Sequence, residues 1–466
     1  MKIGIIGAGA AGLTAAYELG QKGHEVEVFD RAPFVGGQAS TFDLNGSKLE
    51  RGYHHLFLSD VDIIDLVDEL GMSHILEYSD SSVGTFCDSK IYRFASALDL
   101  LKFTPISFVD RIRLGLVTLL ISRINNWKKL EGFTADEWLR KYTGDSAYDA
   151  FWGPMLKGKF GEKYFHKIGM TWIWGKIHTR FASRKNKFSK EKLIYPVGGF
   201  EQIFERMKNL IHEQGNRVHI SKNVSKIITD ESKAIGLEVH DSPYTWTSPQ
   251  PLVNKSEDQT ALHANSNIKV STYKFDSVIA TCSAPVFSRL IEKHSDFPNS
   301  YLNKLQKIEY MSAVMLILVI NEPFTKYYWL NIAESSIPFV GIIEHTNLVS
   351  PSLYSGKHIL YITNYLTKED RLYQLDHKDL LAEYIPHLSK INPEFDADSI
   401  EDSYIHKVDY AQPIVGSNYS NVILDHTTPV KGLYLCNTTQ VYPEDRGTNY
   451  SVRLGKKIAT KVMENQ

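Results

Sequence analysis

The amino end of the chain arranges its apolar and polar positions in a β–turn–α–β order. Ile3 to Ile6 is a short apolar run that predicts a buried strand, and Leu13 to Gly20 predicts a helix. Apolar and acidic residues alternate in Glu25 to Phe29, which is typical of a second strand. A glycine doublet, Gly36-Gly37, follows, and the apolar spacing of Asp60 to Leu70 predicts an amphipathic helix. This order is typical of an α/β fold.

The middle of the chain is helical and then returns to strands. Ala95 to Arg184 follows a helical pattern rich in aromatic and basic residues, and Arg111 to Trp127 is apolar around most of its circumference. A helix is predicted over Glu201 to Gln214 and a strand over Arg217 to Ile228. Asp241 to Asn267 is polar and proline-containing, with little periodicity, so we interpret it as an excursion between strands.

The carboxyl half predicts strands of two different sheets. Strand character returns at Phe275 to Ala280. Strands of a second sheet are predicted at Met311 to Ile320, Phe339 to His345 and His358 to Tyr365. The chain closes with a strand, a loop and a helix, over Gly432 to Cys436 and Asn449 to Met463.

The composition excludes several classes of protein. The 466 residues are 43% hydrophobic and carry a net charge of −2, which gives no electrostatic basis for binding nucleic acid. Cys87, Cys282 and Cys436 have no paired or CxxC spacing, which indicates a reducing compartment and argues against disulfides or a metal site. No secretory signal and no run of ~18 uncharged apolar residues are visible, so we expect a cytoplasmic protein.

The first glycine turn predicts a dinucleotide site. It follows a strand, opens a helix and consists of Gly7, Gly9, Ala10, Ala11 and Gly12 around Ala8. Gly7 allows the tight turn, Gly9 leaves room for a pyrophosphate, and Gly12 lets the helix pack closely on the strand. The helix amino terminus offers free N–H groups to the phosphates. Asp30, at the end of the second strand, is placed to accept hydrogen bonds from a ribose diol.

The next segment indicates which dinucleotide is bound. Arg31 to Thr41 reads RAPFVGGQAST and resembles the second glycine motif of the amine oxidase, protoporphyrinogen oxidase and phytoene desaturase superfamily. The resemblance implies FAD as cofactor, with Arg31 in this motif and with the backbone of Gly36 and Gly37 beside the ribityl-pyrophosphate. The family usually has arginine where this chain has Gln38, so no charge clamp is expected at that position.

Three further segments resemble the same family in the same order. Tyr195 to Phe200 resembles its YPxGG turn, and Phe275 to Thr281 resembles its DxVIxAT strand. The strand around Val224 is implied to hold the adenine end through its backbone. The segment from Gly432 to Tyr450 resembles the closing FAD motif. The resemblance places the strand end at Asn437 beside the ribityl chain, and it aims the helix start, with Thr448, Asn449 and Tyr450, at the flavin. Asn437 stands where the family usually has aspartate.

These matches imply the fold class and the domain organisation. The class is α/β: a Rossmann-like FAD-binding domain of the two-dinucleotide-binding type, with an inserted substrate domain of mixed sheet plus helices. We assign residues 1–95, 190–290 and 405–466 to the discontinuous FAD-binding domain. The substrate-binding domain is predicted to comprise residues 96–189 and 291–404.

Three residues are candidates for catalysis. The family resemblance places Gly52 to Phe57 along the flavin face, so His54 or His55 could transfer a proton or orient the substrate. The other histidine would then be structural. Arg446 precedes the helix start that the resemblance aims at the flavin; a surface position without a functional contact is the alternative.

The helical segment contains candidates for an apolar substrate site. Phe151, Trp152, Trp172 and Trp174 form either core packing or the wall of a site for a hydrophobic substrate. Leu98 to Lys129 forms either a buried helix pair or a peripheral membrane contact with basic residues at its rim.

We weigh three functions. The leading hypothesis is an FAD-dependent oxidase or desaturase that accepts a hydride from an apolar substrate such as a polyprenoid, tetrapyrrole or amine. The alternative is a non-redox sugar mutase resembling UDP-galactopyranose mutase, whose GxH element Gly52-Tyr53-His54 matches. The third is a flavin-retaining binding protein without turnover. The electron acceptor and the oligomeric state are left open.

Overall fold

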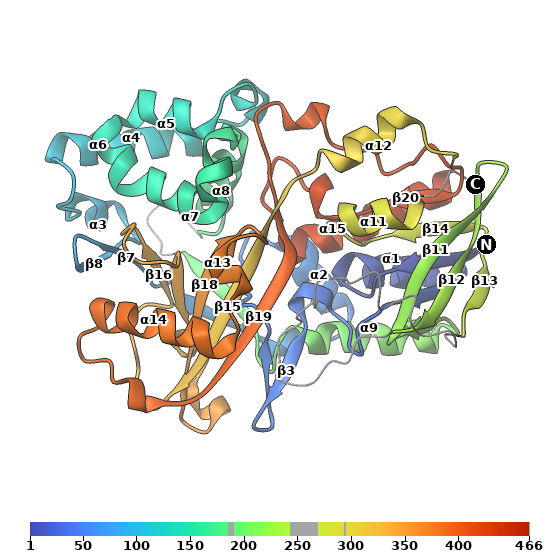
Figure 1. Ribbon diagram of the computed structural model, residues 1–466, viewed down its shortest axis with the longest axis horizontal. Helices are drawn as coiled ribbons and strands as arrows, with labels where there is room; N and C mark the ends of the chain where they lie inside the picture. The colour runs from blue at the N-terminus through green and yellow to red at the C-terminus, as the bar shows by residue number, and fades with distance from the viewer. Residues whose placement is uncertain (185–190, 243–268, 293–294, 466) are drawn as a thin grey trace.

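The computed structural model describes residues 1–184, 191–242, 269–292 and 295–465. Figure 1 shows two large sheets side by side, with the helices of the middle segment above the seven-stranded one. Almost all of the polar stretch Asp241 to Asn267 lies outside the described residues. Among the residues described, no helix has both the length and the apolarity needed to cross a membrane.

A parallel sheet of five strands is the centre of the dinucleotide-binding half. Its order is β10-β2-β1-β14-β20, and every pairing is parallel. The strands are β1 (Lys2–Ile6), β2 (Glu25–Phe29), β10 (Arg217–His219), β14 (Ser277–Ala280) and β20 (Leu433–Leu435). The sheet therefore combines the first strands of the chain with one of its last, as the α/β prediction requires.

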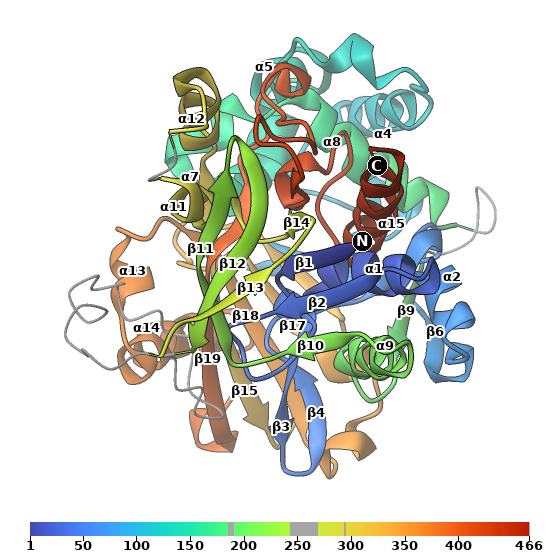
Figure 2. The same ribbon diagram turned by 90° about the vertical axis from the view of Figure 1, so that its right-hand side faces the viewer.

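The two faces of this sheet are covered differently. Ile3 and Ile5 pack with the helices on one face, whereas Ile6 packs on the other, because side chains alternate along a strand. The helices are α1 (Ala10–Gln21), α9 (Glu201–Glu213) and α15 (Thr448–Glu464). The opposite face carries α11 (Ala284–Ile291) and an antiparallel sheet of β11 (Lys222–Asp230), β12 (Lys233–Asp241) and β13 (Ser271–Lys274), visible at the front of Figure 2.

The second large sheet is mixed and has the order β19-β15-β18-β17-β16-β7-β8. Alternate residues of β15 separate its two faces: Val314 and Leu316 pack with α14 (His377–Ile391), and Ala313 and Met315 face the opposite side. The strands are β7 (Val83–Cys87), β8 (Lys90–Arg93), β15 (Tyr310–Ile320), β16 (Trp329–Ile332), β17 (Gly341–Glu344), β18 (His358–Leu366) and β19 (Ile400–Pro413).

The middle segment is helical, as predicted. Ser107 caps α4, because its hydroxyl accepts a hydrogen bond from the Asp110 N–H at 3.2 Å. This cap starts the helix before the predicted Arg111, and the helix ends at Ser122, short of Trp127. The helices are α3 (Ala97–Leu101), α4 (Phe108–Ser122), α5 (Ala135–Thr143), α6 (Asp145–Ala147), η4 (Tyr148–Trp152), α7 (Gly153–Tyr164) and α8 (Met170–Ala182).

Smaller elements complete the fold. They include the hairpin of β3 and β4 and the sheet β5-β9-β6. Their bounds, with those of the remaining helices longer than one turn, are β3 (Thr41–Leu44), β4 (Ser47–Glu50), β5 (Leu56–Phe57), β6 (Leu76–Asp80), β9 (Lys192–Pro196), α2 (Val61–Glu69), α12 (Asn299–Gln306) and α13 (Arg371–Gln374).

One predicted strand needs correction, and the pairing of three other strands bears on the predicted domain bounds. The single strand predicted over Arg217 to Ile228 is two strands, because Ser221 takes a left-handed φ of 53° and redirects the chain from the parallel sheet into the antiparallel one. Strands β7 and β8 lie within residues 1–95, which the sequence assigns to the FAD-binding domain. Strand β7 pairs with β16 of the second sheet, and β8 pairs with β7 at its edge. Strand β19 also crosses the predicted boundary at residue 405.

Candidate active site

A single cavity of about 1270 Å³ runs from the glycine turns to the helical segment. Its wall includes Gly9 and Val224 at one end, His54 and Arg446 in the middle, and Phe151 at the other end. All of the predicted site residues line it except Gly12. Residues that are far apart in the sequence are therefore brought to one continuous space.

The two glycine turns touch each other. Gly9 and Gly36 form a bridge, and a Cβ added to Gly37 would lie 3.2 Å from the Gly9 Cα. Gly7 has a left-handed φ of 107°, which favours glycine. A Cβ on Gly12 would lie only 2.0 Å from the Gly7 carbonyl oxygen, so Gly12 permits the helix to pack on the turn. This packing is the role that the sequence predicts for Gly12, which explains why it lies behind the cavity wall.

Asp30 stands at the end of β2 and is held by backbone. Its carboxylate accepts hydrogen bonds from the N–H groups of Ala8 at 2.7 Å and Ala32 at 2.8 Å. Burial raises the pKa of Asp30, and these two hydrogen bonds oppose the shift. The carboxylate thus faces the cavity in a fixed orientation, beside Arg31 and within reach of the same space as Val224.

The amino terminus of α15 also opens onto the cavity. Its cap residue, Gly447, supplies no side-chain hydrogen bond, so the first N–H groups of the helix have no capping side chain. Asn449 is 2% exposed, and its Oδ1 accepts from the Ile63 N–H at 3.1 Å, whereas its Nδ2 has no partner among the described residues. Thr448 and Tyr450 line the same part of the wall. A buried donor without a partner fits a ligand acceptor at this point.

Asn437 and Gln38 both form hydrogen bonds with the protein. The Asn437 Oδ1 accepts from the Thr439 N–H at 3.0 Å and from its hydroxyl at 2.6 Å, and Nδ2 donates to the Cys282 carbonyl at 3.0 Å. Only the second Nδ2 hydrogen is left for a ligand. The Gln38 amide donates to the Tyr410 carbonyl at 3.4 Å, on β19. Both side chains are therefore held by the protein, although both also line the cavity.

The residues present fit FAD. Two glycine turns without side chains, a carboxylate at the strand end and an uncapped helix amino terminus match a pyrophosphate, a ribose diol and a flavin carbonyl. Among the described residues, no group of three or more His, Cys, Asp or Glu side chains could hold a metal ion.

His54 and His55 both lie in the cavity wall, and both are neutral. The His54 Nδ1 lies 2.5 Å from the Gly52 carbonyl, which can only accept, so Nδ1 carries the hydrogen and Nε2 is an acceptor. Burial lowers the pKa of His54 to about 4 and that of His55 to about 3. Both pKa values lie well below the ordinary value of histidine. The His55 Nδ1 pairs with the Tyr328 hydroxyl at 3.0 Å.

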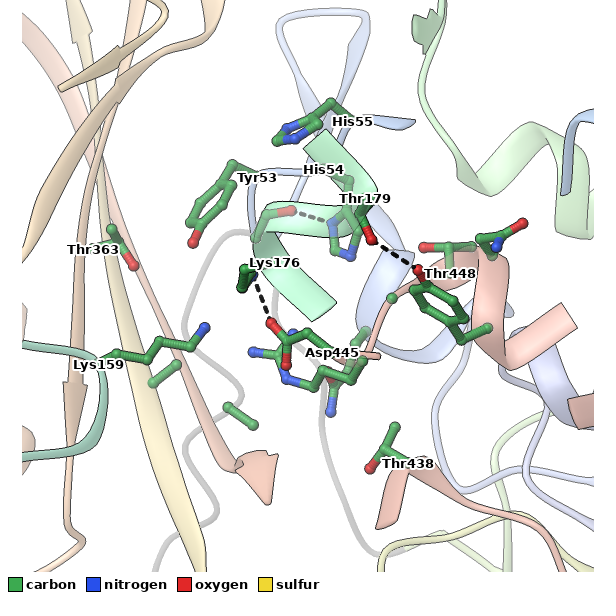
Figure 3. Close-up of a pocket in the computed structure, with 18 of the residues that line it drawn as sticks. Tyr53, His54, His55, Lys159, Lys176, Thr179, Thr363, Thr438, Asp445 and Thr448 are labelled. Atoms are coloured by element: carbon green, nitrogen blue, oxygen red, sulfur yellow. Dashed lines mark hydrogen bonds and ion pairs between the residues drawn. The ribbon is translucent and has the colours of Figure 1, made fainter. Parts of the chain in front are cut away.

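Charged residues that the sequence did not single out gather beside Arg446. Figure 3 shows Lys159 and Asp445 approaching the same space as Tyr53, and Lys176 pairs with Asp445 at 2.6 Å. Although burial alone would raise the pKa of Asp445, Lys176 and Lys159 hold it well below its usual range. Arg446 is thus inside the cavity, not on the surface. No motif marked Lys159 or Lys176, because isolated lysines on helices are usually solvated.

The far end of the cavity is apolar. Phe151, Trp152 and Trp172 line it, whereas Trp174 packs in the core and donates from its ring to the Ile124 carbonyl at 2.7 Å. Four residues of α3 and α4 both line the cavity and reach the exterior, so the cavity opens there: Leu101, Ile112, Leu116 and Leu119. One alternative for Leu98 to Lys129 was a buried helix pair. In the structure, only one face of α4 is buried.

The fold and the site together define a flavin-dependent protein of the dinucleotide-binding type. The chain belongs to the flavin-containing amine oxidoreductase family, which matches residues 10–443. Membership confirms the predicted superfamily, the FAD cofactor and the class of FAD-dependent oxidoreductases.

The chain is also similar to individual proteins in sequence and in structure. The chain is 37% identical over 73% of its length to a zeta-carotene desaturase of Arabidopsis thaliana, and 24% identical over 65% to a probable zeta-carotene desaturase of Synechococcus elongatus. It spans 61% and 63% of the lengths of these two relatives. A crystal structure of an oxidoreductase from Methanosarcina mazei superposes with a TM-score of 0.72 over all of both chains, at 19% identity.

Proposed function

We propose that the protein is an FAD-dependent oxidase or desaturase that takes a hydride from an apolar substrate. One observation carries the proposal: the cofactor end and the apolar end belong to the same cavity. An apolar molecule seated against Phe151 and Trp172 would reach the space beside His54 and Arg446 without crossing solvent. The names of the desaturase relatives, which refer to carotenes, support a substrate of this kind.

In this proposal the chain holds FAD by its backbone and orients the substrate by side chains. Bound FAD would supply the two-electron acceptor. The amides of the first glycine turn would bind the pyrophosphate, and the uncapped start of α15 would place a positive dipole end near developing negative charge. Neutral His54 would act as a hydrogen-bond acceptor through Nε2, and Arg446 would supply a fixed positive charge. We also propose Arg31, Gln38 and Val224 as cofactor contacts.

A peripheral membrane contact through α4 belongs to the same proposal. Val109, Ile112, Leu116 and Leu120 follow one face of α4 and are all exposed. Exposed basic residues flank α4 in the sequence, at Lys102, Arg123, Lys128 and Lys129. An apolar face with a basic rim suits the headgroup region of a bilayer. The opening of the cavity on this face would let an apolar substrate enter from lipid.

Anaerobic titration of the purified holoprotein tests the proposed function. A polyprenoid, a tetrapyrrole and an amine are added separately, and the flavin absorbance bands are followed. We expect bleaching by one class of apolar substrate and recovery of the bands on adding an electron acceptor. Activity towards a nucleotide sugar only after reduction with dithionite would favour the mutase alternative. Retained colour without bleaching by any candidate would favour a binding protein.

A further inference from the structure

The middle of the cavity contains more positive than negative side chains. Lys159, Lys176 and Arg446 face it, and Asp445 is the carboxylate that interacts with all of them. Lys176 pairs directly with Asp445 at 2.6 Å. Among the described residues, no carboxylate lies within 4.0 Å of the charged nitrogens of Lys159 or Arg446. We call Lys159, Lys176, Asp445 and Arg446 the cation cluster.

The remaining contacts of Lys159 and Arg446 are with Tyr365. Although burial alone would raise the pKa of the Tyr365 hydroxyl, these two cations lower it. Lys159 lies over the ring of Tyr365, with Nζ 3.9 Å from the ring centroid, and Arg446 donates to the Tyr365 hydroxyl at 3.4 Å. The Arg446 Nε has no hydrogen-bond partner among the described residues. Two other carboxylates of the cavity wall pair elsewhere, Asp409 with Lys368 at 2.8 Å and Glu191 with Arg180 at 3.5 Å. Burying cations without partners is costly, so a ligand anion would stabilise this arrangement.

The cation cluster continues directly from the apolar wall. Phe151, Met155 and Lys159 follow one another at four-residue intervals through η4 and α7, and all three line the cavity. On α8, the apolar Trp172 is followed four residues later by Lys176, and both line the cavity. Two helices thus present a wall that is apolar towards the opening at α4 and positive towards the dinucleotide-binding half.

We infer that the substrate is an apolar chain with an anionic head group, a carboxylate or a phosphate, and that Lys159 and Arg446 bind this head group. The inference rests on the proposed function and names its substrate class. The chain of the ligand would lie along α4 and α7, and the head group would sit beside Tyr365 and Tyr53. Purely hydrocarbon substrates would leave Lys159 and Arg446 without a carboxylate or phosphate partner of their own.

Binding of three ligands that share one chain tests the inference. Farnesyl phosphate, farnesoic acid and farnesol are titrated into the holoprotein, and the Kd values are measured by calorimetry. We expect at least one anion to bind about tenfold more tightly than farnesol, as a charge-assisted hydrogen bond is lost in the alcohol. The comparison of the acid with the phosphate distinguishes the two head groups.

Variants of Lys159 test whether this residue causes the preference for anionic ligands over farnesol. Lys159→Met should remove most of the preference for the anion and leave the affinity for farnesol unchanged, and Lys159→Arg should retain it. Lys163→Met, at an exposed position on the same helix, is the matched control and should behave as the parent protein. Equal Kd values for farnesol and both anions would overturn the inference. So would a Lys159→Met variant that shifts the flavin reduction potential but keeps the preference.

The outcome is separable from the proposed function because binding is measured without turnover. Tight binding of an anion to a protein that no ligand bleaches would contradict the oxidoreductase proposal and support the head-group site. Bleaching by farnesol or a hydrocarbon, in a protein that binds anions no more tightly than farnesol, would support the oxidoreductase proposal and contradict the head-group site.

Discussion

Gly9 and Gly12 of the first glycine turn have different roles. Gly9 has φ −79° and ψ −178°, which any residue adopts, and an added Cβ would meet only the Gly37 Cα at 3.8 Å. Gly12, in contrast, has no room for a Cβ because of the Gly7 carbonyl oxygen. Gly9 therefore leaves room for the ligand, whereas Gly12 leaves room for α1 to pack against the turn.

Alanine at each position separates these roles. We expect Gly9→Ala to change the free energy of unfolding of the apoprotein by less than about 1 kcal/mol, because its backbone conformation suits alanine. The Kd for FAD should nevertheless rise about tenfold or more, since the Cβ would occupy the approach to the pyrophosphate. Flavin fluorescence titration and denaturant unfolding measure the two quantities.

Gly12→Ala is the comparison. A Cβ at 2.0 Å from a backbone oxygen forces α1 away from β1, and we expect a loss of about 3 kcal/mol or more in unfolding free energy. An apoprotein of parental stability with Gly12→Ala, or parental FAD affinity with Gly9→Ala, would contradict these assignments.

The protonation of His54 gives a prediction about pH. Because burial lowers its pKa to about 4, the ring stays neutral as pH falls from 8 to about 5 and gains a proton only near the lower value. We expect the ring 15N resonances of selectively labelled protein, assigned with His54→Gln, to show an unchanging Nδ1–H tautomer over that range. A titration of His54 near its ordinary pKa of about 6.5 would contradict the buried geometry.

Single residues differ in how far the sequence predicts them. The glycines and Asp30 could be identified because strand, turn and helix fix their geometry locally. Lys159 and Lys176 could not, because their direction depends on how α7 and α8 pack against β18 and the loop before α15. The hydrogen bonds of the Asn437 amide likewise involve Cys282 and Thr439, and only the folded chain brings Cys282 close to Asn437.

At the scale of elements, α4 departs most from a buried helix. Only Leu114, Val117 and Ile121 are buried, while Val109 and Leu120 are 73% and 51% exposed. Since Val109 and Leu120 do not line the cavity, they can be changed without altering its wall.

The double variant Val109→Glu, Leu120→Glu tests the membrane contact. We expect its partitioning onto phosphatidylcholine–phosphatidylglycerol vesicles to fall about tenfold or more, because each residue loses apolar burial and adds a charge that anionic lipid repels. Vesicle co-sedimentation measures the bound fraction. Val422→Glu, at a residue that is also 51% exposed but distant in sequence, should bind as the parent does. Equal binding by the double variant would contradict the proposal.

Elements with local patterns were predicted well. Strands β1 and β2 and helices α1 and α9 follow from periodicity within a few residues of their observed ends. The long strand β19 was missed, because its buried and exposed positions change pattern between Tyr404 and Ala411. The pairing of β7 with β16 joins residues far apart in the chain, and no local pattern specifies such a partner.

At the scale of the whole molecule, three distant segments meet at one cavity. The first and second glycine turns touch at Gly9 and Gly37, and α15 packs on α1 from the other end of the chain. The helical segment and the second sheet complete the wall. Cofactor binding should therefore depend on the integrity of both halves, which a motif at one end alone would not require.

The identity and stoichiometry of the bound cofactor test whether the two glycine turns and α15 hold one molecule of FAD. The purified protein is denatured, and the released cofactor is identified by chromatography and counted against protein. We expect FAD, at close to one per chain. A colourless protein that takes up no added FAD, or one that binds only a nicotinamide dinucleotide, would contradict this expectation.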